Sequence, residues 1–261
     1  MPRFAANLSM MFTEVGFLDR FEAAARTGFK GVEFLFPYDH PPEAIAERLQ
    51  RNKLTLALFN MPPGDWGAGE RGMAALPGRE QQFRDGLGEA IRYAKATGCK
   101  TVHAMAGLWP QGRDKAEGDS VYVENLRWAA DRLAPEGLTA IIEPINTRDI
   151  PGYFLNTTGQ AMRIIEQVGR PNLRLQLDLY HVQIMEGDLA PKIRALAGQY
   201  PHVQIAGTPG RHEPDIGEVN YAFLFDLFDE LGYGGWIGCE YRPKGETLAG
   251  LGWARHYGIG G

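Results

Sequence analysis

Cysteine and long apolar runs are what this 261-residue sequence has least of. Its two cysteines, Cys99 and Cys239, stand far apart and outside any CxxC motif, so neither a disulfide framework nor a thiolate zinc site is indicated. No window approaches the roughly 20 apolar residues of a membrane span, and the first residues lack the apolar core of a signal peptide. We therefore expect a cytoplasmic protein with no membrane contact.

An excess of positive charge is missing as well. The formal net charge is -5 and no basic cluster stands out, so the sequence offers no electrostatic footprint for a nucleic acid. Hydrophobic residues make up 44% and charged residues 23%, which is ordinary for a globular protein with a sizeable core. These proportions favour a small-molecule partner.

What the sequence does have is a regular alternation of short β-branched and apolar runs with amphipathic stretches. The apolar runs predict eight strands, at residues 4–8, 31–36, 54–60, 101–107, 139–145, 173–179, 202–207 and 236–241. The amphipathic stretches predict helices at residues 17–28, 42–52, 80–98, 121–133, 157–168, 189–199 and 221–231. A last helix, at residues 247–257, is short and interrupted by glycine.

This rhythm is typical of βα units around a parallel sheet. Eight strands, mostly short connections and no Pro/Ser-rich linker favour a single α/β domain over residues 1–261, closed as a (β/α)8 TIM barrel. An open doubly wound sheet is the alternative.

One connection, residues 61–79, is long and rich in glycine and proline, and it carries Trp66, Glu70 and Arg71. Such a loop is either a lid over an active site or a mobile surface segment. Residues 67–72 also satisfy the GxGxxG pattern. Because they neither follow a strand directly nor open a helix, we do not expect a dinucleotide site there.

Four consecutive predicted strands each carry one carboxylate or carboxamide inside an apolar run. These residues are Glu143, Asp178, Gln204 and Glu240. In a barrel of this kind the active site lies where the strands end, so the four side chains should converge. The four strands contain no lysine, and their one arginine, Arg174, lies near the start of its strand. Buried carboxylates need a counter-charge, and oxygen ligands without cysteine or an obvious histidine favour Mg2+ or Mn2+.

Several long motifs resemble the hydroxypyruvate isomerase family, and together they cover nearly the whole chain. They are FAANLSM at 4–10, GVEFLFPY at 31–38, IEPIN at 142–146, LDLYHVQ at 177–183, HVQIAG at 202–207, RHEP at 211–214, GEVNY at 217–221 and GCEY at 238–241.

The resemblance implies a xylose-isomerase-like barrel whose divalent metal is bound by Glu143, Asp178, Gln204 and Glu240. It also implies interconversion of hydroxypyruvate and tartronate semialdehyde (2-hydroxy-3-oxopropanoate), an aldose-ketose type isomerisation of a hydroxy-oxo acid through an enediolate. Close relatives act instead on 2-oxo-tetronate and give 3-oxo-tetronate. Glu143 and Glu240, on the fifth and eighth strands, are our candidates for the catalytic base and acid.

Four further residues are candidates for contact with the substrate. His181 lies just past the end of the sixth strand. Arg211 follows the seventh strand, and its planar guanidinium either clamps the substrate carboxylate or pairs with Glu213. His103 and Asn7 lie near the ends of the fourth and first strands.

Other functions stay open at this point. Related sugar epimerases usually have His where this chain has Gln204, which disfavours a ketose 3-epimerase. An endonuclease of damaged DNA is suggested by fold analogy alone, and it needs several metals, more histidine ligands and a basic groove, against six His and a net charge of -5 here. A non-catalytic sugar-acid binding module is the third class. Long loops at the mouth of the barrel suggest a homodimer.

Overall fold

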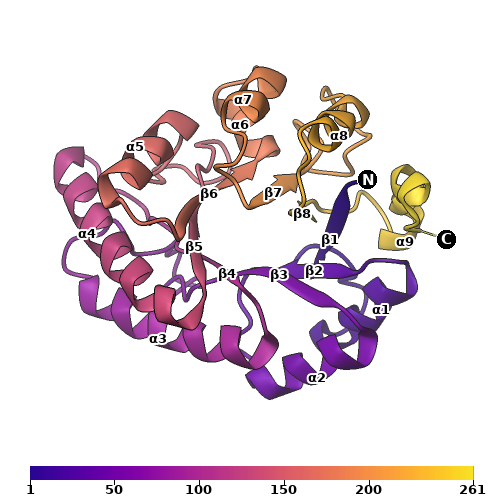
Figure 1. Cartoon of the computed structure of the whole chain (residues 1–261), viewed down its shortest axis with the longest axis horizontal. Helices are drawn as coiled ribbons and strands as arrows, with labels where there is room; N and C mark the ends of the chain where they lie inside the picture. The colour runs from indigo at the N-terminus through magenta and orange to yellow at the C-terminus, as the bar shows by residue number, and fades with distance from the viewer. Residues whose placement is uncertain (261) are drawn as a thin grey trace.

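A computed structural model describes residues 1–260, whose strands form a closed parallel barrel. Each strand pairs with the next along the chain, and β8 pairs with β1 to complete the ring (Figure 1). The strands are β1 Arg3–Asn7, β2 Gly31–Phe34, β3 Thr55–Asn60, β4 Thr101–His103, β5 Thr139–Ile142, β6 Leu173–Asp178, β7 His202–Ile205 and β8 Trp236–Cys239. The predicted TIM barrel is confirmed, and the open sheet is wrong.

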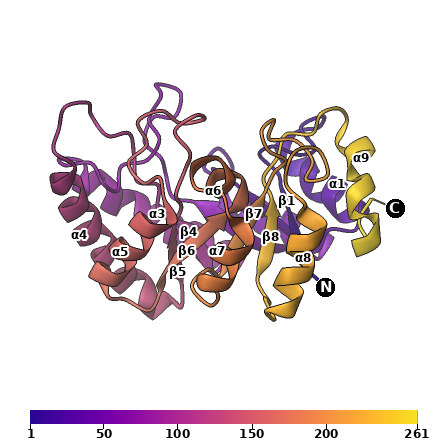
Figure 2. The ribbon, with the colours of Figure 1, turned by 90° about the horizontal axis from the view of Figure 1, so that it is seen from above.

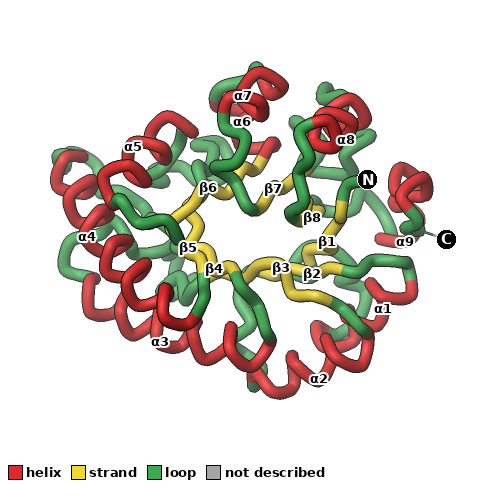
Figure 3. The backbone as a smooth tube through the Cα atoms, in the orientation of Figure 1, coloured by secondary structure: helices red, strands yellow, loops and turns green. Residues whose placement is uncertain are grey.

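Helices surround this barrel on its outside (Figure 3). They are α1 Arg20–Arg26, α2 Pro42–Asn52, α3 Glu80–Thr97, α4 Lys115–Leu133, α5 Thr158–Val168, α6 Leu179–Met185, α7 Leu189–Ala195, α8 Tyr221–Glu230 and α9 Thr247–Gly250, with short 3-10 turns at Phe17–Asp19, Ala134–Glu136 and Leu251–Tyr257. In the side view of Figure 2 the longer connections project beyond the helices on one side of the ring. Within residues 1–260, no helix combines the length and apolarity needed to cross a membrane.

The largest departure from the predicted elements is α6, which the sequence analysis did not anticipate. Its backbone begins directly after β6, because the carboxylate of Asp178 accepts hydrogen bonds from the N–H groups of Tyr180 (2.7 Å) and His181 (3.3 Å). A carboxylate that satisfies free N–H groups in the first turn is a strong N-terminal cap. The strand therefore passes into a helix without an intervening loop.

Smaller departures have similarly local causes. Helix α4 begins at Lys115 rather than at residue 121, since Asp114 accepts a hydrogen bond from the N–H of Ala116 (3.0 Å) and caps it there. The predicted last helix is α-helical only over Thr247–Gly250 and continues as a 3-10 turn. Most strands end earlier than predicted, because the residues that follow leave the ladder to line the mouth of the barrel.

Two kinds of interior result from this architecture. Apolar side chains fill the space between strands and helices, as do Phe21, Leu87, Leu126, Ile164 and Phe228. The barrel itself encloses buried polar side chains, among them Asn7, Glu33, His103, Gln176, Asp178, His202 and Gln204. On β6 and β7 these alternate in register, with Gln176 beside His202 and Asp178 beside Gln204, so they form successive layers inside the ring.

Gly238 on β8 makes room for one of these polar groups. A Cβ atom at this position would overlap with the carboxylate of Glu33 on β2, which is separated from β8 only by β1, whereas one at Gly234 would meet nothing within 4 Å. We expect Gly238→Ala to lower the free energy of unfolding by about 1–3 kcal/mol, as overpacking does. Gly234→Ala is the matched control and should stay close to the wild type. Urea unfolding of the two variants measures the difference, and equal stability would contradict the close packing.

Candidate functional site

The strand ends bring together a cluster of titratable side chains at the mouth of the barrel. Glu143 follows β5, Asp178 ends β6, His181 lies in the first turn of α6 and Glu240 follows β8. One oxygen or nitrogen atom from each lies within 4.8 Å of those of the others, and all four residues are buried. Three of the four predicted ligands thus converge, joined by a histidine that the sequence analysis had placed in contact with the substrate.

The acids in this cluster repel each other in a poorly solvated site. Burial, followed by the charges of Glu240 and Asp178, raises the pKa of Glu143 well above its ordinary value. Burial also raises the pKa of Glu240 to about 8, although the neighbouring Arg211 lowers it in part. A carboxyl group whose pKa is raised, as that of Glu240 is to about 8, suits proton transfer near pH 7.

Arg211 supplies positive charge that the sequence analysis did not assign to the acids. Its Nη2 lies 2.6 Å from Oε2 of Glu240 and its Nη1 lies 3.1 Å from Oδ2 of Asp149. Burial lowers the pKa of Arg211, but the surrounding acids, Glu240 first, outweigh this effect and raise it. Pairing with Glu213, the alternative partner, is wrong, because Glu213 accepts hydrogen bonds from the backbone N–H of Lys244.

Hydrogen bonds determine which nitrogen of His181 carries its proton. Its Nδ1 lies 2.7 Å from Nδ2 of Asn146, whose Oδ1 accepts a hydrogen bond from the N–H of Asp149. The Asn146 amide therefore donates to Nδ1, and the proton of a neutral ring stays on Nε2. Burial lowers the pKa of His181 to about 4, so the ring is neutral. Its Nε2 lies 3.7 Å from Oε1 of Glu143 and 3.6 Å from Oδ2 of Asp178, too far for a hydrogen bond to either acid.

The donor set fits a hard divalent cation. Oε1 of Glu143 is buried and has no hydrogen-bond partner among residues 1–260, and one arginine faces three carboxylates. With Nε2 of His181 protonated, the available ligands are oxygens, which is the chemistry that Mg2+ and Mn2+ prefer. The cluster could therefore hold a metal ion.

Beneath the cluster lies a polar network that the sequence analysis missed. Glu33 accepts hydrogen bonds from Nδ2 of Asn7 (2.9 Å) and Nε2 of Gln204 (2.8 Å), and its Oε2 lies 2.6 Å from Nε2 of His202. Oε1 of Gln204 in turn accepts from Gln176. The network holds the Gln204 amide in one orientation. Glu33 and Gln176 interrupt apolar strands just as Asp178 does, so the same rule applied to every strand would have found them.

His103 is the other buried polar residue beside the cluster. Its Nδ1 lies 3.6 Å from Oε2 of Glu143, and neither ring nitrogen has a hydrogen-bond partner within residues 1–260. Burial lowers its pKa to about 3, so the ring is uncharged. His103 thus lies next to Glu143 without neutralising it.

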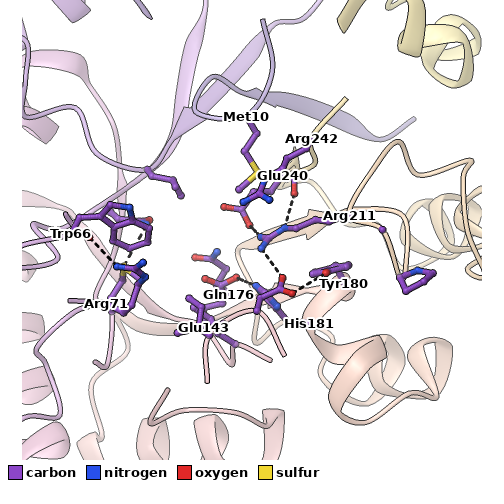
Figure 4. Close-up of a pocket in the computed structure, with 18 residues that line it drawn as sticks. Met10, Trp66, Arg71, Glu143, Gln176, Tyr180, His181, Arg211, Glu240 and Arg242 are labelled. Atoms are coloured by element: carbon purple, nitrogen blue, oxygen red, sulfur yellow. Dashed lines mark hydrogen bonds and ion pairs between the residues drawn. The ribbon is translucent and has the colours of Figure 1, made fainter. Parts of the chain in front are cut away.

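A cavity of about 460 Å³ opens above these residues (Figure 4). Among the predicted site residues, Glu143, His181, Arg211 and Glu240 line it. The other four, Asn7, His103, Asp178 and Gln204, lie behind this lining. Trp66 and Arg71, from the 61–79 loop, face Arg211 and Tyr180 across the cavity (Figure 4). The 61–79 loop therefore contributes Trp66 and Arg71 to the site. Residues 67–72, which match the GxGxxG pattern, are not followed directly by a helix, since α3 begins at Glu80.

A parallel eight-stranded ring with buried acids at the strand ends defines an enzyme of the (β/α)8 class. Residues 21–257 match the family model of the xylose isomerase-like TIM barrel, and the chain belongs to this family.

Two curated relatives extend over the full chain. A 2-oxo-tetronate isomerase of Cupriavidus necator is 57% identical, with 98% of this chain and 99% of the relative covered. The hydroxypyruvate isomerase of Escherichia coli is 50% identical, with 98% and 100% covered. The chain is an isomerase of this family, as the motifs predicted.

Solved structures agree with the fold. A crystal structure of an AP endonuclease, family 2, from Brucella melitensis is 55% identical, with a TM-score of 0.97 and 98% and 99% of the two chains covered. A 3-keto-D-glucoside 4-epimerase from E. coli has a TM-score of 0.80 at 21% identity, covering 98% and 100%, and this likeness concerns the fold alone.

Glu33 should be important for stability, because it is buried and three donors converge on it. Glu33→Gln keeps its shape but turns an acceptor into a donor among other donors, and we expect a loss of about 3 kcal/mol in the free energy of unfolding. Glu22→Gln, which removes an exposed ion pair with Arg26, is the control and should change stability by less than about 0.5 kcal/mol. Urea denaturation compares them. Equal losses in the free energy of unfolding for the two variants would mean that the Glu33 network contributes nothing to stability.

Cation binding to the cluster should expel protons, because carboxylates bind metals only when ionised and the pKa of Glu240 is raised to about 8. Without a cation, this shift makes the fold lose stability as the pH rises from about 4.5 to about 8. We expect Mn2+ to bind more tightly as the pH rises to about 8. Calorimetry in buffers of different ionisation enthalpy measures the released protons. Glu240→Gln should release fewer, and binding that is independent of pH would contradict the assignment.

Proposed function

We propose that this isomerase interconverts hydroxypyruvate and 2-hydroxy-3-oxopropanoate by moving a proton between adjacent carbons through an enediolate. The observation that carries the proposal is the position of Glu143 and Glu240, two buried carboxyl groups that line one cavity. Burial raises the pKa of each above its ordinary value, as suits carboxyl groups that accept and return a proton. The names of the curated relatives support the substrate class.

Glu143 and Glu240 are the proposed base and acid. Arg211 orients Glu240 through its contact with Oε2, whereas Oε1 of Glu143 has no partner within residues 1–260 and can accept a proton. His181 presents a neutral N–H to the site, suited to a substrate oxygen. That Asn7 and His103 contact the substrate stays a prediction. Asn7 donates a hydrogen bond to Glu33, and His103 lies next to Glu143.

The proposed metal ligands are Glu143, Asp178, Gln204 and Glu240, and the proposed ion is Mg2+ or Mn2+. Gln204 qualifies because Glu33 holds its Nε2, which leaves the carbonyl oxygen, with two lone pairs, for Gln176 and one further partner. When bound, the ion supplies positive charge that stabilises the oxygens of the enediolate.

The second candidate substrate is 2-oxo-tetronate, which is favoured by the name of the 57% identical relative. Both acids carry a hydroxyl group next to a keto group, so one site could act on either. The ratio of kcat/KM values for the two substrates decides between them.

Solvent proton exchange tests the proposed reaction. We expect the protein with Mn2+ to exchange a carbon-bound proton of hydroxypyruvate or 2-oxo-tetronate with D2O, followed by NMR. Glu143→Gln and Glu240→Gln should each reduce exchange by at least about 100-fold, because each removes one proton-transfer group. Glu246→Gln, on the exposed C-terminal segment, is the control.

The alternatives give different outcomes in the same assays. Full exchange by Glu240→Gln would contradict the two-glutamate mechanism. Metal-dependent affinity without turnover would indicate a binding module. Cleavage of DNA that contains an abasic site would favour the activity named for the Brucella melitensis relative, although a net charge of -5 does not favour binding to DNA.

Two further proposals concern the setting of the enzyme. We propose a cytoplasmic location, which is supported by two buried cysteines that form no disulfide. A homodimer formed through the loops at the barrel mouth is also proposed, and sedimentation velocity would measure it.

A further inference from the structure

Recognition of an acid substrate favours a cation that is not already paired with acids of the protein, and Arg211 is paired with two of them. Its Nη2 contacts Oε2 of Glu240 (2.6 Å) and its Nη1 contacts Oδ2 of Asp149 (3.1 Å), while its Nε donates to the carbonyl oxygen of Glu240 (3.4 Å). The guanidinium also lies 4.9 Å from the ring centre of Tyr180. Three of the five N–H donors of Arg211, one on each nitrogen, thus contact the protein, and two of these contacts are with carboxylates.

Arg71 lines the same cavity and has free donors. Its Nη1 donates to the carbonyl oxygens of Trp66 (3.2 Å) and Glu70 (2.7 Å), and its guanidinium stacks 3.9 Å from the ring centre of Trp66. Within residues 1–260 no carboxylate lies within 4.0 Å of Arg71, and its Nε and Nη2 donate to nothing in the protein. These two nitrogens form one edge of the guanidinium, which can bind both oxygens of a carboxylate.

The loop around Arg71 holds this cation in place and directs the neighbouring acid to another arginine. Its neighbour Glu70 forms a two-pronged ion pair with Arg79 instead, which lowers the pKa of Glu70 to about 2. Gly72 has a φ of 102° and lies so close to the backbone of Met105 that a Cβ atom would not fit. These constraints fix the backbone on both sides of Arg71.

Trp66 supports the guanidinium of Arg71 through its aromatic ring. Its ring lies 4.9 Å from that of Phe36, centre to centre, and covers one face of the Arg71 guanidinium. A cation stacked on an aromatic ring loses little freedom when it binds an anion, and the ring reduces its exposure to water. Figure 4 shows Arg71 and Trp66 on the side of the cavity opposite Arg211.

We propose that Arg71 is the residue that selects acid substrates. It binds their carboxylate through Nε and Nη2, while Arg211 forms its ion pair with Glu240. This inference rests on the proposed function and names the group that gives that function its substrate class. Arg242 is the competing cation, since it also lines the cavity without an ion pair in residues 1–260, but it is exposed and its guanidinium is not fixed by a hydrogen bond.

The kinetic test compares charged substrates with neutral counterparts that carry CH2OH in place of the carboxylate. These pairs are hydroxypyruvate with dihydroxyacetone, and 2-oxo-tetronate with erythrulose. We expect Arg71→Met to raise KM for the acids by about 10- to 100-fold, the effect of losing a charged hydrogen-bonded pair, with little change in kcat. Values for the neutral substrates should not change, and Arg71→Lys should restore part of the affinity.

Two matched variants accompany this test. Arg84→Met removes an arginine that stacks on Trp128, outside the cavity lining, and should behave as the wild type. Arg242→Met should raise KM for the acids less than Arg71→Met does. Equal losses on acid and neutral substrates, or a larger effect of Arg242→Met, would overturn the proposal.

A binding measurement keeps this inference separate from the proposed function. Calorimetry with glycerate, an unreactive acid, and with its uncharged amide needs no turnover. We expect the wild type to prefer glycerate and Arg71→Met to lose that preference. If the wild type isomerises neither acid yet binds glycerate through Arg71, the proposed reaction fails and the carboxylate site stands. An unchanged preference in Arg71→Met refutes the site itself.

Discussion

The constraint that governs this protein is the electrostatic cost of three carboxylates crowded at the end of a barrel. Glu143, Asp178 and Glu240 are each almost fully removed from water, and Arg211 is the cation in direct contact with one of them. The hydrogen bonds that Asp178 accepts as the cap of α6 offset part of that cost. The raised pKa values of Glu143 and Glu240 show that protonation relieves another part. The repulsion that remains between the carboxylates favours a bound cation.

The polar barrel interior is the support for that crowding. Glu33 gathers Asn7, His202 and Gln204 below the acids, and Gly238 leaves the space in which its carboxylate lies. A barrel filled with aliphatic side chains would be simpler to stabilise, but it would not orient an amide or a carboxylate at the mouth. Stability and site geometry therefore depend on the same hydrogen bonds.

The two sides of the cavity carry groups with different roles. The β5, β6 and β8 ends provide groups that exchange protons, and the 61–79 loop brings an aromatic ring and an arginine from the opposite side. Because the strand ends are rigid and the loop is held by its own ion pair, both sides have defined positions. Chemistry and substrate choice can then vary independently, as is common in barrels whose loops carry specificity.

The sequence alone determined the alternation of strands and helices, the barrel and the convergence of Glu143, Asp178 and Glu240, because periodicity and position at a strand end are local properties. The isomerase family was indicated by the resemblance of its long motifs. Tertiary structure alone decided which cation meets which acid. Arg211 pairs with Glu240 and not with Glu213, and Glu33 binds Gln204 across the barrel interior. Glu70 pairs with Arg79, so Arg71 has no acidic partner within residues 1–260. These pairings join residues from different elements or from different parts of one loop, and only the closed barrel and its folded loops set their distances.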